Sequence, residues 1–226
     1  MAKTSLAIAE DTVPAYINTE TSRGNENVGA QLAIPRIKQL QKMSDEVDKH
    51  HPKYIEGAEP GMFLNTLSGA TLGEDLYVIS INFTTEFVVW RTRDAGGGYI
   101  GAGATAAEAQ ALIDAQEDDK GQQVPASNFQ ITETHSHLMV LKDPKTGELS
   151  MPAIFDFANS KLSVSKNWNT QISMKGGDRF AGLWHVSTVA VENRSGATYL
   201  NLKIDWTGWA QEEDYKAAEA LYQSHA

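Results

Sequence analysis

The sequence has 226 residues, 41% of them hydrophobic and 21% charged, with a formal net charge of −10 at pH 7 and no cysteine. This composition indicates a folded globular protein of one large domain, and the lack of cysteine excludes disulfides, thiol nucleophiles and cysteine-ligated zinc. The negative charge opposes non-specific binding to nucleic acid, so such binding would depend on a local basic surface and on salt.

No apolar run in the sequence reaches the roughly eighteen residues that a membrane-spanning helix requires. The N-terminal sequence MAKTSLAIAEDTVP contains Glu10 and Asp11 where a secretory signal would continue its apolar region. We therefore expect a cytoplasmic protein that has no contact with a membrane.

The chain begins with a polar segment. Residues 1–31 are rich in Thr, Asn, Gly and Glu, which predicts a flexible N-terminal arm. The main domain is expected over residues 32–209. Near its start, Ser44 is positioned to cap a short helix that ends before Pro52, whereas the residues preceding Ser44 fit a strand or a helix.

The clearest strand signal lies in the sequence DLYVISINFTTEFVVWRTR. Tyr77, Ile79, Ile81 and Phe83 occupy every second position among β-branched and aromatic neighbours, a pattern that is typical of a strand. This long strand is expected to belong to the core of a β-rich domain.

A glycine-rich loop and an alanine-rich helix follow this strand. Thr105 and Glu108 have the spacing of a capping box, which predicts the start of the helix. Because this segment separates two strand patterns, we interpret residues 95–126 as an insertion. Beyond it, residues 128–142 and 149–157 alternate on either side of a turn, which predicts a hairpin.

The segment of residues 160–173 is predicted to form a helix. Ser160 can cap it, and Val164, Trp168 and Ile172 recur every four positions. A strand is the alternative structure for this segment.

Two further strands and a terminal helix complete the predicted elements. Residues 181–192 and 197–206 alternate as strands joined by the turn NRSG, and residues 210–226 predict an acidic C-terminal helix or tail. Strands with one helix after the third follow the order of an OB-fold. The predicted fold class is therefore mainly β with α: an OB-fold-like antiparallel five-stranded barrel with an inserted helix and a C-terminal helix.

Two parts of the sequence place tryptophan beside cations. Residues 161–180 carry four basic side chains and one acidic side chain, and Trp90 precedes Arg91. Single-stranded nucleic acid is bound by cations that contact phosphates and by aromatic rings that stack on bases. The candidate DNA-binding residues are Arg36, Lys38, Trp90, Arg91, Arg93, Lys161, Lys166, Trp168, Lys175 and Arg179.

An alternative interpretation assigns these residues to the structure alone. Trp168 would then pack in the core beside Val164 and Ile172, because aromatic residues at helical spacing are usually buried. The cations, together with Lys42, would lie on solvated surfaces.

The best candidate for an enzyme site is the sequence ETHSH. On a strand, Glu133, His135 and His137 point to one side, and two imidazoles with a carboxylate can bind zinc or iron. No further ligand is indicated nearby, and the sequence GGGYIGAG fits neither a dinucleotide-binding motif nor a P-loop. We therefore predict no enzymatic activity, no cofactor and no metal, with a metal-dependent enzyme as the weaker alternative.

Four segments carry a resemblance to a known family: IPRIKQLQKMSDEVD, YIEGAEPGMFLNTLSG, FVVWR and SKLSVSKNWNTQI. Over about residues 34 to 206, the sequence resembles the single-stranded DNA-binding proteins of tailed bacteriophages. The resemblance implies an OB-fold core and binding of single-stranded DNA during phage replication or recombination. It also implies phage or host replication proteins as partners and a location in the cytoplasm of the infected bacterium.

The C-terminus departs from that family. Its members often end in a long acidic tail with a terminal aromatic residue that docks replication partners, whereas this chain ends in EEDYKAAEALYQSHA. The departure places tail-mediated recruitment in doubt and favours a helix that packs on the barrel or on a second subunit. The alternative function is that of a phage structural or assembly protein without nucleic-acid binding.

Overall fold

The computed structural model describes residues 33–193 and 195–225, so the predicted arm of residues 1–31 lies outside the described residues. The described chain forms an eight-stranded sheet with three α-helices. None of these helices is long and apolar enough to cross a membrane. The strands are β1 (Arg36–Gln39), β2 (Phe63–Asn65), β3 (Asp75–Arg91), β4 (Tyr99–Gly103), β5 (Phe129–Lys142), β6 (Ala153–Ala158), β7 (Gly182–Glu192) and β8 (Thr198–Trp209), and the helices are α1 (Ala106–Asp114), α2 (Leu162–Lys175) and α3 (Glu212–His225).

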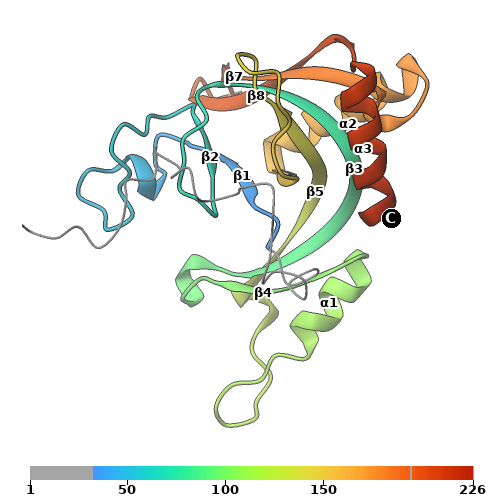
Figure 1. Ribbon diagram of the computed structural model, residues 1–226. Coiled ribbons are helices and arrows are strands. Elements are labelled where there is room, and N and C mark those ends of the chain that lie inside the picture. The colour runs from blue at the N-terminus through green and yellow to red at the C-terminus, as the bar shows by residue number, and fades with distance from the viewer. Residues whose placement is uncertain (1–32, 194, 226) are drawn as a thin grey trace, which may run out of the picture. The chain divides into compact units, whose positions relative to one another are not determined.

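The strands follow the order β2-β1-β6-β5-β3-β7-β8, and β4 pairs with β3. Their pairing is antiparallel, apart from the parallel pair of β1 with β6. Figure 1 shows β3 as a long arc, with β4 and α1 near one of its ends. The prediction of a mainly β fold with helices is confirmed. The sheet has eight strands rather than the predicted five, because β1, β2 and β4 are too short to produce a clear alternating pattern.

A β-bulge divides β3 into two halves. The pairing of β3 with β5 shifts between Ser80 and Asn82, so the side chains that point to a given face change from even to odd positions. Before the bulge, Val78 faces the main hydrophobic core, and after it Phe83 lies on the same face, against His137. The predicted alternation of Tyr77 through Phe83 on one face is therefore interrupted at the bulge.

The two faces of the sheet are covered by different helices. Trp168 of α2 packs with Phe155, Phe157 and Trp184 on the face that holds the main core. On the opposite face, Ala218 of α3 belongs to a second cluster with residues of β3 and β5. The C-terminal helix therefore packs on the sheet.

The predicted starts of α1 and α2 have different outcomes. Thr105 accepts a hydrogen bond from the Glu108 backbone N–H at 3.2 Å, which confirms it as the N-cap of α1, while the Glu108 carboxylate accepts one at 2.9 Å from the Ala104 N–H, one residue before the N-cap. The helical interpretation of residues 160–173 is also confirmed, but Ser160 is not the cap. A 3-10 turn over Asn159–Lys161 precedes α2, which begins at Leu162.

Side chains of β1 and of the residues just after it form hydrogen bonds with β7 and β8. The buried Gln39 amide donates hydrogen bonds to the Thr188 hydroxyl at 2.8 Å and to the Asn201 carbonyl at 3.0 Å. Gln41 donates to the Leu200 carbonyl at 3.2 Å. Because β1 also pairs with β6, these bonds link the two ends of the curled sheet.

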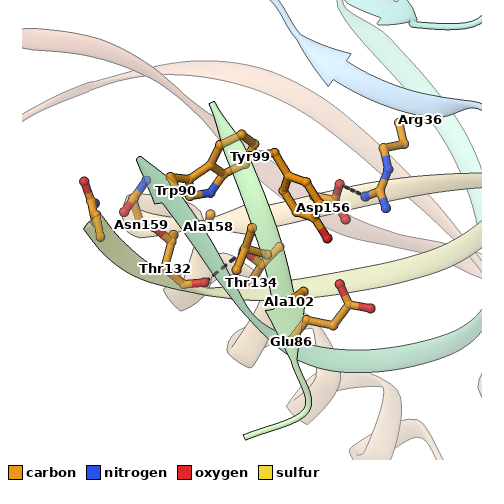
Figure 2. Close-up of a pocket in the computed structure, with 12 residues that line it drawn as sticks. Arg36, Glu86, Trp90, Tyr99, Ala102, Thr132, Thr134, Asp156, Ala158 and Asn159 are labelled. Carbon is orange, nitrogen blue, oxygen red and sulfur yellow. Dashed lines mark hydrogen bonds and ion pairs between the residues drawn. The ribbon is translucent and has the colours of Figure 1, made fainter. Parts of the chain in front are cut away.

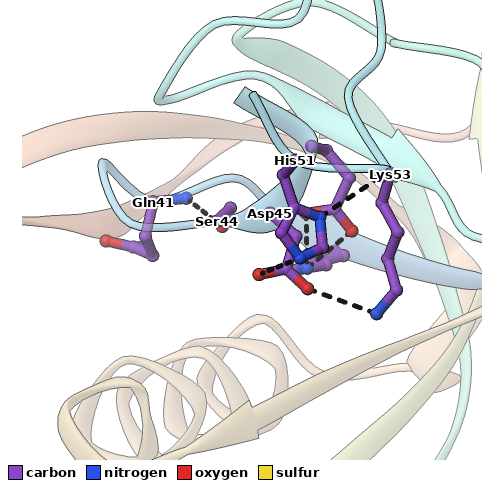
Figure 3. A network of polar contacts seen from close by, with 7 residues as sticks. Gln41, Ser44, Asp45, His51 and Lys53 are labelled. Atoms are coloured by element: carbon purple, nitrogen blue, oxygen red, sulfur yellow. Dashed lines mark hydrogen bonds and ion pairs between the residues drawn. The ribbon is translucent and has the colours of Figure 1, made fainter. Parts of the chain in front are cut away.

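The predicted helix after Ser44 is only one 3-10 turn, Asp45–Val47. The Ser44 hydroxyl does not cap it and instead accepts a hydrogen bond from the Gln41 backbone N–H at 2.9 Å. In the polar network that Figure 3 shows, the Lys53 ammonium donates to the Asp45 carboxylate at 3.2 Å, which lowers the pKa of Asp45. These contacts hold the loop between β1 and β2.

Candidate nucleic-acid interface

An open groove of about 660 Å³ lies on the sheet, lined by residues of β1, β3, β4, β5 and β6 (Figure 2). On β3, the side chains that line it are Glu86, Val88 and Trp90, which alternate along the strand. Val89, between them, points to the other face and packs against α1. One face of this end of the sheet is thus covered by a helix, and the opposite face is left open by the residues that the structure describes.

Two exposed aromatic rings stand at one end of the groove. The exposed fraction is 45% for Trp90 and 60% for Tyr99, and their ring centroids are 5.6 Å apart in an edge-to-face arrangement. The two residues pair across β3 and β4, which are joined by a turn that includes Gly96 with a φ of 99°. The strand register therefore holds two aromatic faces in solvent, where planar ligands can stack on them.

Most of the other side chains that line the groove are polar, beside the apolar Val88, Ala102 and Ala158. Thr132 and Thr134 come from β5, and Asn159 adopts a left-handed φ of 54° directly after β6. Asp156 pairs with Arg36 and also accepts a hydrogen bond from the Ser136 hydroxyl at 2.6 Å. These groups provide hydrogen-bond donors and acceptors beside the aromatic pair.

Arg36 and Trp90 are the predicted site residues that line this groove, and most of the others are engaged elsewhere. Lys38 pairs with Glu46 at 2.8 Å, and Lys166 lies 3.5 Å from Glu133. The Lys175 ammonium lies 4.7 Å from the centre of the Trp206 ring. The basic stretch of residues 161–180 therefore does not present one cationic surface.

Three more of the predicted site residues lie close in sequence to the groove residues Trp90 and Asn159. Arg91 points to the face opposite the groove, with its guanidinium 5.7 Å from the centre of the Phe129 ring. Arg93 is exposed and makes no ion pair within the part of the chain that the structure describes. Lys161 is also unpaired among the described residues, and burial lowers its pKa to about 8.

Trp168 is a core residue. None of its surface is exposed, and its ring stacks on His137 with centroids 4.5 Å apart and an angle of 18° between the planes. It also contacts Trp184 edge-to-face. The interpretation of Trp168 as a base-stacking residue is therefore wrong, because α2 turns this side chain into the space between the helix and the sheet.

Arg179 is also a structural residue. Its guanidinium donates hydrogen bonds to Ser80 at 2.8 Å, to Asn169 at 2.7 Å and to His137 at 3.0 Å, and it lies 5.3 Å from the centre of the Phe83 ring. Burial lowers the pKa of Arg179 to about 10. Its donors are used within the fold, so Arg179 is not a good candidate for contact with phosphate.

A directional chain of hydrogen bonds extends from this arginine. Arginine only donates, so His137 Nδ1 must accept and His137 Nε2 then donates to the Ser165 Oγ at 2.7 Å. The Ser165 hydroxyl donates to His135 Nδ1 at 2.8 Å, and His135 Nε2 donates to the Glu133 carboxylate at 3.1 Å. Burial, followed by the charge of Arg179, lowers the pKa of His137 to about 2, which keeps it neutral.

This hydrogen-bond chain engages the three residues of the predicted metal site. Glu133, His135 and His137 do share one face of β5, but all four imidazole nitrogens are already hydrogen-bonded. The residues described contain no group of three side chains that could hold a metal ion. Ser165, which is hydrogen-bonded to both histidines, is completely buried.

Several groove residues were not identified from the sequence. Tyr99 follows three glycines, and its position opposite Trp90 could be expected only once β4 was recognised as a strand. Glu86, Thr132 and Thr134 are spread over two strands, and only their pairing brings them together. A search for polar residues at alternate positions near Trp90 would have found Glu86.

Comparison with known proteins identifies a family. The model of a family described as Pam3 phage gp34-like protein matches residues 3–226. No curated protein and no solved structure matches the chain. Because the match covers nearly the whole sequence, this chain belongs to the Pam3 phage gp34-like family of bacteriophage proteins.

Proposed function

We propose that this protein binds single-stranded DNA in the groove beside Trp90 and Tyr99, and that it coats and protects such DNA during phage replication or recombination. The observation that carries the proposal is the exposed aromatic pair beside an open groove that also presents polar side chains. Stacking of bases on aromatic side chains contributes about 1–3 kcal/mol per base and tolerates any sequence. Two such rings at one end of a groove suit unpaired bases.

The strand order supports the proposal. Strands β3, β5, β6, β7 and β8, with α2 between the third and the fourth, follow the order of an OB-fold. We infer that these five strands are the OB-like part and that β1, β2, β4 and α1 are additions to it. In OB-folds, oligonucleotides bind on the outer face of the second and third strands, which correspond here to β5 and β6, both of which line the groove.

Few of the cations that were predicted to bind DNA remain available for contact with phosphates. Arg93 follows Trp90 by three residues, and Lys161 follows the groove residue Asn159 by two. Neither makes an ion pair among the residues described, whereas Arg36 is held by Asp156. We therefore assign the phosphate contacts to Arg93 and Lys161, and the main part of the affinity to stacking.

Titration with oligo(dT) tests the proposed function. We expect quenching of tryptophan fluorescence, because the exposed Trp90 indole changes its environment when a base stacks on it. With two phosphate contacts, the slope of log K against log salt should be about −1.4, since each contact on a single strand contributes about −0.7. Absence of binding even at low salt would contradict the proposal and favour a structural or assembly role.

The pH dependence of binding provides a second test. Burial holds the pKa of Lys161 near 8, and a neighbouring phosphate favours the charged form, so binding should raise this pKa. The affinity is then complete below about pH 8 and declines as the pH rises through that value. We expect a decrease of roughly five- to tenfold between about pH 7 and pH 9, measured by titration with oligo(dT).

Lys161→Met is the matched variant for this test. It has no ammonium to titrate, so its affinity should be lower at neutral pH and should not change with pH in this range. An equal decrease in the parent and in Lys161→Met would mean that Lys161 does not contact the phosphates.

A further inference from the structure

Of the two carboxylates in the groove lining, Glu86 has no cationic partner among the residues that the structure describes. Glu86 is partly buried and lines the groove, and it forms no ion pair and no hydrogen bond with the side chains that the structure describes. The other groove carboxylate, Asp156, is already engaged by Arg36 and Ser136. With Arg36 as the cation of the groove lining, the two carboxylates leave this surface with one net negative charge.

Glu86 is placed so that a further base of a strand that stacks on the aromatic pair can meet it. It lies on the same face of β3 as Trp90, four residues away, which corresponds to about 13 Å along a strand. Figure 2 shows Glu86 and Ala102 together at the end of the groove away from Trp90. Ala102 pairs with Val88 on the neighbouring strand, and its small side chain keeps this space open.

The chemistry of an ionised carboxylate restricts what can bind beside it. A carboxylate only accepts hydrogen bonds, so the group that faces Glu86 must donate them. A phosphate cannot donate and is repelled. Among the bases, cytosine carries an amino group at the position where thymine carries a carbonyl oxygen, and Glu and Asp are the side chains that accept from the cytosine amino group.

We propose that Glu86 makes the groove selective among bases, with cytosine preferred over thymine. The proposal rests on the function proposed above, because it assigns a base preference to the same groove. The cytosine amino group donates to the Glu86 carboxylate, whereas the thymine carbonyl oxygen meets it as a second acceptor and is repelled. Stacking on Trp90 and Tyr99 does not distinguish the two bases in this way.

The test compares oligo(dC) and oligo(dT) of equal length at the same salt and neutral pH. We expect the parent protein to bind oligo(dC) about tenfold more tightly, within the discrimination that a good side-chain contact to a base provides. In Glu86→Gln the amide can also donate a hydrogen bond, so the preference should fall to about twofold or less, and binding of oligo(dT) should become tighter.

Glu213→Gln is the matched control. Glu213 is an exposed residue of α3 that does not line the groove, and the variant removes the same charge. It should retain the tenfold preference. Equal binding of both oligonucleotides by the parent, or an unchanged preference in Glu86→Gln, would overturn the assignment of Glu86 while leaving DNA binding intact. Binding of neither oligonucleotide would overturn the proposed function, and the base preference with it.

Discussion

Replacement of Trp90 by alanine should weaken binding of single-stranded DNA about five- to 150-fold and leave the thermal midpoint nearly unchanged. The ring is 45% exposed and stands at the groove, so its removal takes away a stacking surface worth about 1–3 kcal/mol. It creates no cavity in the core. Affinity is measured by titration with a labelled oligonucleotide, and stability by thermal unfolding of the same preparation.

Trp209→Ala is the control for Trp90→Ala. Trp209 is 61% exposed and ends β8, where it contacts Trp206 edge-to-face, and it does not line the groove. Trp209→Ala removes an exposed indole that lies outside the groove, so the affinity for single-stranded DNA should not change. Equal loss of affinity in both variants would indicate a general effect of exposed tryptophan, and normal binding by Trp90→Ala would exclude the groove as the DNA site.

Replacement of Trp168 by alanine should lower the free energy of unfolding by about 3–5 kcal/mol. The side chain is completely buried and stacks on His137, so its loss leaves a large cavity between α2 and the sheet. For a domain of this size, about 1 kcal/mol corresponds to about 2–4 °C in the thermal midpoint. The expected decrease is therefore roughly 6–20 °C, which calorimetry or urea unfolding can measure.

Trp168→Phe separates packing from hydrogen bonding. The Trp168 indole nitrogen is buried without a hydrogen-bond partner among the described residues, so phenylalanine removes no bond seen there and retains an aromatic ring. We expect this variant to lose clearly less stability than Trp168→Ala. A thermal midpoint that stays unchanged in Trp168→Ala would contradict the core position of this residue.

The two tryptophans illustrate how far the sequence can be interpreted. Both stand beside cations in the sequence, and both were candidates for stacking on bases. The structure places Trp90 at the end of a strand beside an open groove and Trp168 on the buried side of a helix. The charged neighbours in the sequence did not distinguish the exposed tryptophan from the buried one. The recurrence of Val164, Trp168 and Ile172 at helical spacing already indicated that Trp168 lies in the core.

The sequence by itself determined the elements whose signal is local. The alternation in β3, the hairpin of β5 and β6, the N-cap of α1 and the helical period of α2 are all set by residues close together in the chain. These patterns exist because a strand repeats every two residues and a helix every 3.6. They sufficed to predict a mainly β domain with an inserted helix and a C-terminal helix.

Only the tertiary structure decided which charged side chains form ion pairs and which side chains from distant segments come into contact. Arg36 and Asp156 are 120 residues apart, and only the pairing of β1 with β6 brings them together. The groove likewise depends on the register that sets Trp90 opposite Tyr99. Ion pairs and binding surfaces form between distant segments, so no local period encodes them, and the choice among possible partners is made only when the strands pair.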